Sequence, residues 1–373
     1  MRVLILSSFT KSLFWFRLDL MADLIAAGHE VFAMGPDDDQ RYMEEFARRG
    51  VLYRSFRVSR NGLSPIEDLR TYLDLKREIR AIAPDKVFTY QAKTIVYGAP
   101  AARRAGVRDV YPLVAGLGSL FRGSGTKNRA IAWILSIQYR RAFRLCERVF
   151  FQNTDDSSLF VSRSLLPEEK IVMLNGSGVD IERFAVAPLP KQPVFLFIGR
   201  LIKDKGTLEY LEACRRIKVL HPHVRCILVG PYDSNPSSLR PEQVAPYVEA
   251  GDVEYLGEHE DVRPILAECS VFVLPSYHEG TPKSVLEAMA VGRPIITTDA
   301  PGCRETVTDG LNGLLVPAGA VDDLVRAMER FVQSPQIARE MGAESRRIAE
   351  MKYDVHKVNE VIMRAMGLVA PSG

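Results

Sequence analysis

The feature that most constrains the fold is a regular alternation of short apolar runs and amphipathic stretches along the chain. Predicted strands in the first half are Val3–Ser7, Glu30–Met34, Lys86–Thr89, Asp109–Val114 and Arg148–Phe151. Helical stretches lie between them, and several end at a glycine such as Gly28 or Gly106. Strands and helices that alternate in this way form a parallel sheet with helices on both faces. The first half is therefore predicted to be one α/β unit.

The alternation is interrupted between Ala185 and Pro193, where three prolines fall within nine residues. Such a segment is typical of a stiff linker between domains. The alternation then resumes and continues to about residue 350. We therefore predict an α/β fold of two doubly wound, Rossmann-like domains, residues 1–185 and 186–350. They are expected to face a cleft, because open sheets bind ligands at the carboxyl ends of their strands. Residues 351–373 are predicted to form an amphipathic helix and a short tail.

Composition excludes several classes of protein. Hydrophobic residues make up 47% and charged residues 25% of the chain, which is ordinary for a soluble globular protein. No apolar run reaches the roughly 18 residues that span a bilayer. The five cysteines are scattered without a CxxC pair, which favours reduced thiols in the cytoplasm over a zinc site or disulfides. The six histidines show no metal-binding pattern, so neither a metal nor a cofactor is expected.

The charge is distributed unevenly. Residues 1–185 carry 28 basic and 21 acidic side chains, whereas the remainder carries 21 basic and 25 acidic ones. Within residues 90–148 there are 11 basic residues and only 2 acidic ones. One interpretation is a solvated basic helix face. The other is a surface for an anionic membrane or a phosphate-bearing substrate.

The first segment that carries chemistry follows the linker, where the predicted strand Val194–Gly199 enters a loop containing Arg200 and Lys205. Arginine offers phosphate oxygens a planar fork, and lysine offers a mobile point charge. Gly199 and Gly206 allow a close approach of the backbone. The alternative is a surface turn with two solvated cations.

The second segment runs from Leu274 to Ala290, where a strand ends, a Gly/Pro loop follows and a helix is predicted to begin near Ser284. Backbone N–H groups at such a helix start can form an anion site. Glu279 and Glu287 bracket the loop with seven residues between them. Carboxylates suit sugar hydroxyls better than phosphate. For Glu287 there is an alternative, because Ser284 and Glu287 have the spacing of a capping box.

The third segment, Asn175-Gly176-Ser177-Gly178-Val179-Asp180, lies just before the linker. Its two glycines predict unusual backbone torsions. The segment either forms an edge of the cleft or only seats the hinge between the domains.

These three segments together resemble the motifs of the family 4 retaining glycosyltransferases with the GT-B fold, and the similarity extends to about residue 350. The resemblance implies metal-independent transfer of a sugar from a nucleotide donor with retention of configuration. It also implies that the helix predicted within residues 351–373 crosses back to the N-terminal domain. It implies that Arg200 and Lys205 bind the donor diphosphate, Glu279 the donor sugar and Glu287 the ribose. Arg200, Lys205 and Glu279 are thus the expected catalytic residues. The expected donor site also includes Gly199, Gly280, Thr281 and Pro282. Fixed cations would stabilise the charge on the departing diphosphate.

A narrower resemblance, to PglA-type transferases of bacterial glycan assembly, rests on Val114–Ser119, Gly230–Leu239 and Pro301–Glu305. It implies a UDP-N-acetylhexosamine donor, in particular UDP-N-acetylgalactosamine, and an acceptor sugar on undecaprenyl diphosphate. One departure is Ala115, near the position where many family members have a histidine and the PglA type an acidic residue.

The N-terminal domain is expected to hold the acceptor. Phe14-Trp15-Phe16-Arg17 opens the first helix, and basic residues alternate with apolar ones over residues 120–137. Such interleaving suits peripheral contact with an anionic membrane, although the aromatic residues could instead pack inside the domain. The expected acceptor or membrane residues are Arg17, Gly116, Gly118, Arg122 and Lys127. The chain is accordingly expected on the cytoplasmic face of the inner membrane, with no nucleic-acid partner.

Three other functions are compatible with parts of this pattern. A non-hydrolysing sugar-nucleotide epimerase can share the architecture, and would convert the donor without an acceptor. A Rossmann dehydrogenase would need G-x-G-x-x-G after the first strand, whereas Ser7–Ser12 contains no glycine. A carbohydrate- or membrane-binding protein without activity is disfavoured, because Arg200, Lys205, Glu279 and Glu287 are all present.

Overall fold

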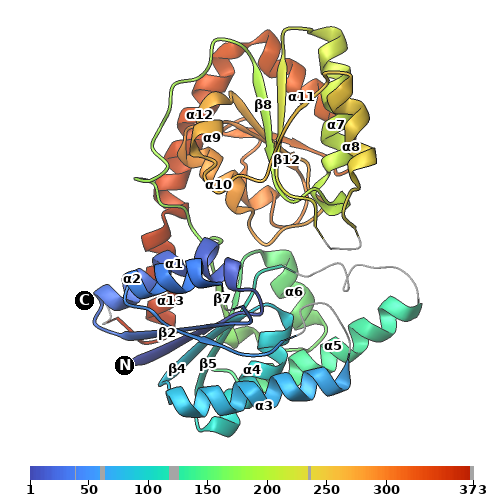
Figure 1. Ribbon diagram of the computed structural model, residues 1–373. Helices are drawn as coiled ribbons and strands as arrows, with labels where there is room; N and C mark the ends of the chain where they lie inside the picture. The colour runs from blue at the N-terminus through green and yellow to red at the C-terminus, as the bar shows by residue number, and fades with distance from the viewer. Residues whose placement is uncertain (38, 59–63, 117–125, 234–236, 370–373) are drawn as a thin grey trace. The chain divides into compact units, whose positions relative to one another are not determined.

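The computed structural model describes residues 1–37, 39–58, 64–116, 126–233 and 237–369, and the chain forms two compact units (Figure 1). Unit 1 consists of Met1–Ser177 together with Val355–Gly373, and unit 2 of Gly178–Asp354. The chain therefore enters unit 2 eight residues before the boundary predicted at residue 185. No helix in the described ranges combines the length and the apolar character needed to cross a membrane.

Unit 1 is built on a seven-stranded parallel sheet in the order β3-β2-β1-β4-β5-β6-β7. Its strands are β1 (Arg2–Leu6), β2 (Glu30–Gly35), β3 (Leu52–Ser55), β4 (Lys86–Tyr90), β5 (Asp109–Val114), β6 (Val149–Phe151) and β7 (Ile171–Met173). The inner strands are buried along almost their whole length, as expected for a sheet covered on both faces. The strand order reverses between the neighbours β1 and β4, which is the switch point of this sheet.

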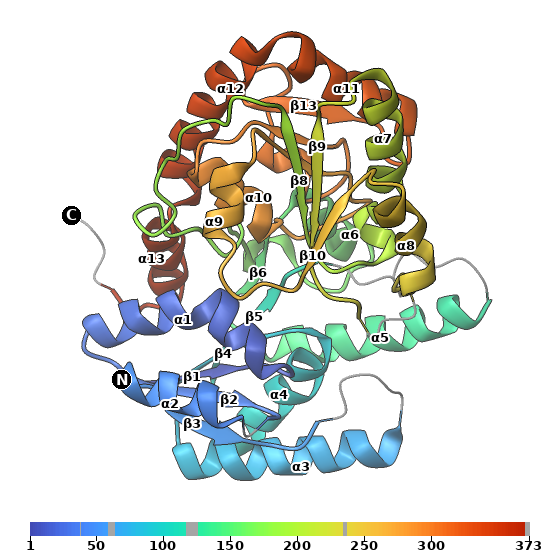
Figure 2. The ribbon, with the colours of Figure 1, turned by 45° about the horizontal axis from the view of Figure 1, so that its top comes forward.

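Helices cover both faces of the unit 1 sheet (Figure 2). They are α1 (Thr10–Ala26), α2 (Gln40–Arg48), α3 (Pro65–Ile82), α4 (Ala92–Ala105), α5 (Thr126–Arg144), α6 (Thr154–Ser162) and α13 (Val355–Ala365). Helices α1, α2 and α13 share one apolar core with the sheet, and α3 to α6 share the core on the other face. The two cores alternate along each strand, since successive side chains point to opposite faces.

The C-terminal helix α13 belongs to the core of unit 1. Val358, Ile362 and Met363 are buried against apolar residues of α1 and the sheet. Asp23 of α1 accepts a 2.7 Å hydrogen bond from Asn359 Nδ2, and its Oδ1 lies 2.9 Å from His356 Nδ1. The end of the chain thus completes the unit with which the chain begins.

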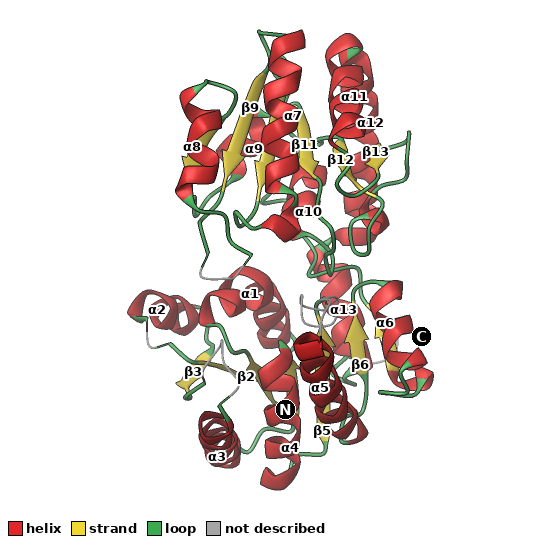
Figure 3. Ribbon diagram, turned by 90° about the vertical axis from the view of Figure 1, so that its right-hand side faces the viewer, coloured by secondary structure: helices red, strands yellow, loops and turns green. Residues whose placement is uncertain are grey.

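Unit 2 contains a six-stranded parallel sheet in the order β10-β9-β8-β11-β12-β13 (Figure 3). The strands are β8 (Val194–Ile198), β9 (Arg225–Val229), β10 (Glu254–Gly257), β11 (Val271–Leu274), β12 (Ile295–Thr298) and β13 (Gly313–Val316). The helices are α7 (Thr207–Leu220), α8 (Pro241–Glu249), α9 (Arg263–Glu268), α10 (Lys283–Ala290), α11 (Val321–Gln333) and α12 (Pro335–Ile348). Its switch point lies between the neighbouring strands β8 and β11.

The proline-rich segment 185–193 is attached to unit 2 by a buried arginine. Arg293 is completely buried, and its guanidinium donates to the carbonyl oxygens of Ala187 and Pro188 at 2.8 and 3.0 Å. It also donates to Leu266 and Ala267 of α9, both at 3.0 Å. The segment predicted to be a linker is therefore fixed to the body of unit 2, because the Arg293 side chain donates hydrogen bonds both to this segment and to α9.

Candidate active site

The candidate site lies at the carboxyl end of the unit 2 sheet, at the switch point between β8 and β11. Residues after β8 form a loop with a short 3-10 turn, Lys203–Lys205, which leads directly into α7. Residues after β11 form the loop that leads into α10. Ligands of doubly wound sheets bind at this position, because two loops diverge there and leave a crevice.

Gly206 allows the two loops to approach each other closely. Its φ angle is +70°, and a Cβ atom at this position would lie 2.0 Å from the carbonyl oxygen of Pro275. Every other amino acid would therefore push the loops apart as well as strain the backbone. The sequence predicts that Gly206 allows a close approach of the backbone. In the structure, the group that it approaches is the carbonyl of Pro275 in the other loop.

Lys205 and Glu279 form the central contact of the site, with Nζ 2.5 Å from Oε1. Both side chains are largely buried, with 19% and 12% of their surface exposed. Ser276 supports the pair, because its Oγ lies 2.8 Å from Glu279 Oε1 and 2.9 Å from the carbonyl oxygen of Asp204. The amide of Tyr277 donates to the same Asp204 oxygen at 2.9 Å. The two loops are thus joined at the point where the cation and the carboxylate meet.

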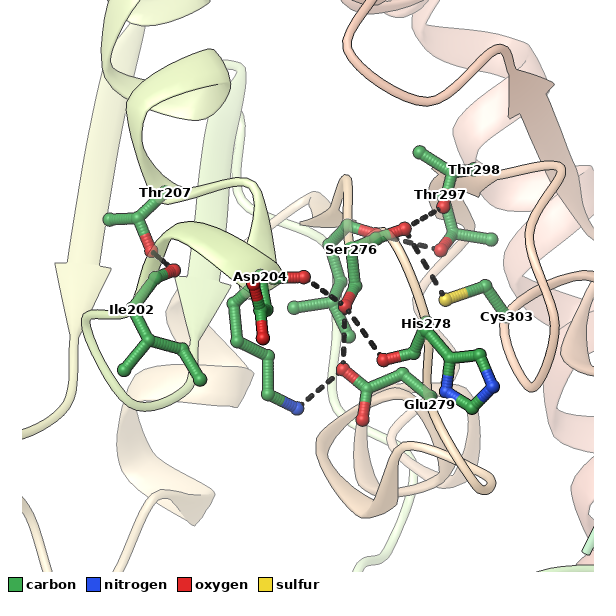
Figure 4. A network of polar contacts seen from close by, with 11 residues as sticks. Ile202, Asp204, Thr207, Ser276, His278, Glu279, Thr297, Thr298 and Cys303 are labelled. Carbon is green, nitrogen blue, oxygen red and sulfur yellow. Dashed lines mark hydrogen bonds and ion pairs between the residues drawn. The ribbon is translucent and has the colours of Figure 1, made fainter. Parts of the chain in front are cut away.

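A second layer of contacts holds the Glu279 loop from behind. Figure 4 shows Ser276 between Asp204 on one side and Thr298 and Cys303 on the other. The hydroxyl of Thr298 donates to the carbonyl oxygen of Ser276, and the amide of Glu279 donates to the carbonyl oxygen of Pro301 at 2.8 Å. These groups come from β12 and the segment after it. The loops that follow three neighbouring strands, β8, β11 and β12, therefore fix the position of Glu279.

Gly302 is required where the third loop passes behind Glu279. Its φ angle is +79°, and a Cβ atom there would lie 2.1 Å from the carbonyl oxygen of Glu279. We expect Gly302→Ala to displace Glu279 and to lower both turnover and melting temperature. Gly310→Ala is the matched control, since it has a similar φ of +76° and no atom within 4 Å. Equal effects of the two substitutions would show that backbone strain alone is responsible.

Two helix N-termini contribute positive potential to the site. Neither α7 nor α10 has a side-chain N-cap hydrogen bond, and α10 begins directly after Pro282. Free N–H groups of a first helical turn carry partial positive charge and bind anions. Together with Lys205 they form a setting for a diphosphate. Gly280, Thr281 and Pro282, all expected in the donor site, form the approach to α10.

Arg200 is placed differently from Lys205. It follows Gly199 at the end of β8, and its Nη1 lies 2.7 Å from Asp233 Oδ2. The Arg200 side chain is 44% exposed, whereas that of Asp233 is 16% exposed. Sequence reasoning did not identify this carboxylate as the partner, although Asp233 follows β9, which is adjacent to β8. The structure thus gives each of the two expected cations a carboxylate partner.

Glu287 lies one turn inside α10, and its capping-box interpretation is wrong. The helix begins at Lys283 with Pro282 at the N-cap position, so Ser284 is already inside the helix and cannot cap it. Within the described residues the Glu287 carboxylate has no hydrogen-bond or ion-pair partner. Burial raises its pKa above the usual value, although the nearby Lys283 and Arg183 oppose the shift. A half-buried carboxylate without a structural partner is suited to accept hydrogen bonds from a ligand hydroxyl.

We expect Glu287→Gln to weaken UDP binding about tenfold without lowering the melting temperature, because it removes a charged acceptor and no structural contact. Calorimetric titration with UDP measures this effect. The pH dependence provides a second test. The raised pKa means that Glu287 takes up its proton at a higher pH than an exposed glutamate, so the difference in affinity should shrink on acidification. An affinity gap that does not depend on pH would contradict this assignment.

The segment from Asn175 to Asp180 spans the point where the chain passes from unit 1 to unit 2. Gly176 and Gly178 have positive φ angles of 71° and 74°, as the two glycines predict. The amide of Val179 donates to Tyr353 O at 2.8 Å, and Asp180 Oδ1 accepts from the amides of Glu182 and Arg183. These contacts fix the backbone of the segment.

The expected membrane role of Arg17 is wrong, because its side chain is only 1% exposed. Position 17 follows Leu13 and precedes Leu20, Met21 and Leu24 on the apolar face of α1, so the helical period turns it toward the sheet. Trp15 on the opposite side is 39% exposed. Gly116 follows β5 with a φ of 116°. Gly118, Arg122 and the side chain of Lys127 lie outside the described residues.

Several residues of the site were not identified from the sequence as contributors. Ser276, Thr298 and Gly302 act by holding Glu279, and Asp233 by pairing with Arg200. Their positions at the carboxyl ends of β11, β12 and β9, or within four residues after these strands, are the signal that the sequence offers. In the part of the chain that the structure describes, no group of three or more His, Cys, Asp or Glu side chains is arranged to hold a metal ion.

Comparison with known proteins gives two family matches that follow one another along the chain. The family described as "Glycosyl transferase 4-like domain" matches residues 16–193, and "Glycosyl transferases group 1" matches residues 192–334. Among similar structures is Anabaena HepE in complex with UDP-glucose, with a TM-score of 0.79 and 18% identity over 99% of this chain and 100% of that one. This likeness concerns the fold alone.

Two relatives have similar sequences and differ in how much of the chain they match. The chain is 27% identical over 368 residues to the N,N'-diacetylbacillosaminyl-diphospho-undecaprenol alpha-1,3-N-acetylgalactosaminyltransferase of Campylobacter jejuni, with 95% of each chain covered. It is also 27% identical over 283 residues to the UDP-Gal:alpha-D-GlcNAc-diphosphoundecaprenol alpha-1,3-galactosyltransferase of Escherichia coli, with 72% of each chain covered.

Proposed function

We propose that this chain, which is a group 1 glycosyltransferase with the GT-B fold, transfers N-acetylhexosamine from a UDP-sugar to a polyprenyl-diphosphate-linked sugar with retention of configuration. The donor proposed is UDP-N-acetylgalactosamine, and the acceptor lipid is undecaprenyl diphosphate. The observation that carries the proposal is the Lys205–Glu279 pair beside the uncapped starts of α7 and α10. The similarity to the Campylobacter jejuni enzyme over 95% of both chains supports the choice of substrates.

In this proposal the donor diphosphate lies against Lys205 and the first turns of α7 and α10. As the bond between the sugar and the diphosphate breaks, negative charge develops on the leaving phosphate oxygen. Lys205 and the helix N-termini are fixed in advance and stabilise that charge without reorganisation. Arg200, more exposed and held by Asp233, adds charge at the rim.

Glu279 has two functions in the same proposal. One carboxylate oxygen, Oε1, faces Lys205 and Ser276 and holds the ammonium group in position. The carboxylate can also accept hydrogen bonds from hydroxyls of the donor sugar. Glu287, which has no structural partner among the described residues, accepts from the ribose hydroxyls. In this proposal the carboxylates accept hydrogen bonds from the hydroxyls of the sugar and the ribose, and the positive groups bind the phosphates.

The test is a donor screen with purified protein. UDP-GalNAc, UDP-GlcNAc and a UDP-hexose are each incubated with a short polyprenyl-diphosphate-linked sugar and EDTA, and mass spectrometry identifies the products. The expected result is a lipid-linked product that carries one added N-acetylhexosamine. Transfer of a hexose alone would contradict the proposed donor. Epimerised nucleotide sugar without transfer would favour the epimerase, and binding of sugar without any conversion would favour a non-enzymatic function.

We further propose that unit 1 makes peripheral contact with an anionic membrane through α5. Trp133 and Ile134 are 66% and 47% exposed on this helix, and Arg129 beside them is also exposed. Exposed apolar and basic side chains on one helix are typical of interfacial binding. The double variant W133S/I134S should lose most binding to vesicles that contain anionic lipid at low salt. The matched variant Val219→Ser, at a 78% exposed position of unit 2, should retain it; equal retention by both would contradict the contact.

A further inference from the structure

The unit 1 sheet has a switch point of its own, between β1 and β4, where Leu6 pairs with Thr89. The chain leaves β1 at Ser7 and β4 at Gln91, and α1 and α4 begin just beyond these positions on opposite faces of the sheet (Figure 2). Neither helix has a side-chain N-cap hydrogen bond. The same geometry in unit 2 provides the candidate donor site. The switch point of unit 1 therefore has the topology of a ligand site.

Gln91 has a backbone conformation that glycine normally adopts. Its φ and ψ angles are 75° and 145°, a region in which a residue with a Cβ atom persists only where its surroundings hold it. Its Oε1 accepts from the amide and hydroxyl of Ser8 at 2.9 and 2.6 Å and from the Ser7 hydroxyl at 3.1 Å. Its Nε2 donates one hydrogen to Ser12 Oγ at 3.1 Å. This network joins both loops of the switch point, and no contact among the described residues uses the second Nε2 hydrogen.

Arg17 is a buried cation beneath this network. Its guanidinium lies 5.4 Å from the ring centre of Phe88 and 5.1 Å from that of Tyr90, whose hydroxyl is 2.9 Å from Ser12 Oγ. Its Nε and Nη1 are enclosed without a hydrogen-bond partner, and no carboxylate among the described residues forms an ion pair with it. Burial lowers its pKa to about 10, so Arg17 remains charged at neutral pH.

The other buried cations among the described residues, Lys86 and Arg293, differ from Arg17 because they have hydrogen-bond or ion-pair partners. Arg293 donates to four carbonyl oxygens, and Lys86 lies 2.6 Å from Asp109 Oδ2 where β4 and β5 begin, at the amino ends of the unit 1 strands. A buried charge without a counter-ion is costly to a protein. The field of Arg17 is not cancelled by a neighbouring carboxylate, so it makes the adjoining switch point favourable for an anion.

We propose that the switch point between β1 and β4 is a phosphate subsite that receives the diphosphate of the acceptor. Gln91 Nε2 and the first-turn amides of α1 and α4 contact the phosphate oxygens. Arg17 acts from behind the Ser12–Tyr90 contact as a positioning charge, and makes no direct contact itself. The inference rests on the proposed function, because it takes the acceptor to be a lipid diphosphate. It adds the part of the chain that recognises the anionic end of that acceptor.

The test measures binding without turnover. Farnesyl diphosphate is titrated calorimetrically into the protein with UDP at saturation, so that UDP fills the nucleotide site of unit 2. We expect Arg17→Met, which keeps the length of the side chain, to weaken this binding on the order of tenfold or more. Gln91→Glu keeps the oxygen that Ser7 and Ser8 bind but introduces a negative charge, and should weaken it at least as strongly. Farnesol, which lacks the diphosphate, should bind all variants equally.

Two further measurements distinguish a ligand-binding role of Arg17 from a structural one. They are the melting temperature of Arg17→Met and the ligand binding of a variant of a second buried cation, Lys86. Arg17→Met removes an unpaired buried charge, so its melting temperature should stay the same or rise. Lys86→Met removes the paired buried cation of β4 and should leave farnesyl diphosphate binding unchanged. The inference is overturned if wild type does not bind farnesyl diphosphate more tightly than farnesol. It is also overturned if Arg17→Met binds like wild type, or if Lys86→Met is equally impaired.

Failure of the proposed function gives a different result. If no donor is transferred to any acceptor while farnesyl diphosphate binding still depends on Arg17, the transferase substrates are wrong and the subsite stands. If transfer occurs with equal kcat/KM in wild type and Arg17→Met for both diphosphate-linked and neutral acceptors, the function stands and the subsite is wrong.

Discussion

Replacing Lys205 by alanine is expected to reduce kcat by about 100-fold or more, since loss of one preorganised group that stabilises developing charge costs roughly 3–4 kcal/mol of barrier. The Nζ atom lies at the centre of the site, 2.5 Å from Glu279, on the turn that leads into α7. Steady-state kinetics with the donor identified by the screen measures the loss. The reduction should be larger in kcat than in the affinity for UDP, because the charge on the diphosphate increases in the transition state.

Lys203 provides the control for this experiment. It belongs to the same 3-10 turn but is exposed, and no side-chain contact joins it to Glu279 in the described structure. Lys203→Ala should therefore retain turnover within about twofold. Since Lys205→Ala also leaves Glu279 without its cation, the melting temperature of both variants has to be measured. A Lys205→Ala protein that is folded and fully active would exclude Lys205 from the reaction.

The largest effect on stability is expected for Arg293→Met. The substitution leaves four carbonyl oxygens in a buried setting without their donor, which costs about 3–5 kcal/mol. In a domain the size of unit 2 this corresponds to a fall in melting temperature of roughly 6–20 °C. Thermal unfolding followed by circular dichroism measures it. Turnover at low temperature should change little, because Arg293 touches none of the candidate site residues.

Arg225 is the matched comparison in the same unit. It forms a salt bridge of 2.8 Å with Glu254, but both side chains are more than 40% exposed. Exposed pairs of this kind contribute at most about 1 kcal/mol, so Arg225→Met should lower the melting temperature by only a few degrees. If both variants unfold at the same temperature, attachment of the proline-rich segment does not depend on Arg293.

The GT-B fold predicted from the sequence is confirmed, and the alternation of apolar runs explains why it could be predicted. Inner strands such as β1, β4 and β8 are buried on both faces and stand out as continuous apolar segments. Strands β3, β7 and β13 were not predicted, because they are edge strands of only three or four residues. Short edge strands have no periodicity that distinguishes them from loops.

The residues of the candidate site could be predicted to different degrees. Lys205 and Glu279 are 74 residues apart in sequence, and their contact could not be predicted from spacing. Nor could the supporting contacts from Thr298 and Gly302, since these depend on how three loops pack. Arg17 illustrates the opposite error. A basic residue next to Trp15 suggests a surface, whereas the helical period places it on the buried face.

The position of α13 has a consequence for the order in which the molecule can be completed during synthesis. Everything in unit 2 is contiguous, so this unit has its whole sequence once Asp354 has left the ribosome. Unit 1 begins first but lacks Val358, Ile362 and Met363 of its core until α13 emerges. The nascent N-terminal half therefore exposes the apolar face of α1 throughout translation of the second half. A premature stop codon after Asp354 would thus damage the first domain rather than the domain beside it in sequence.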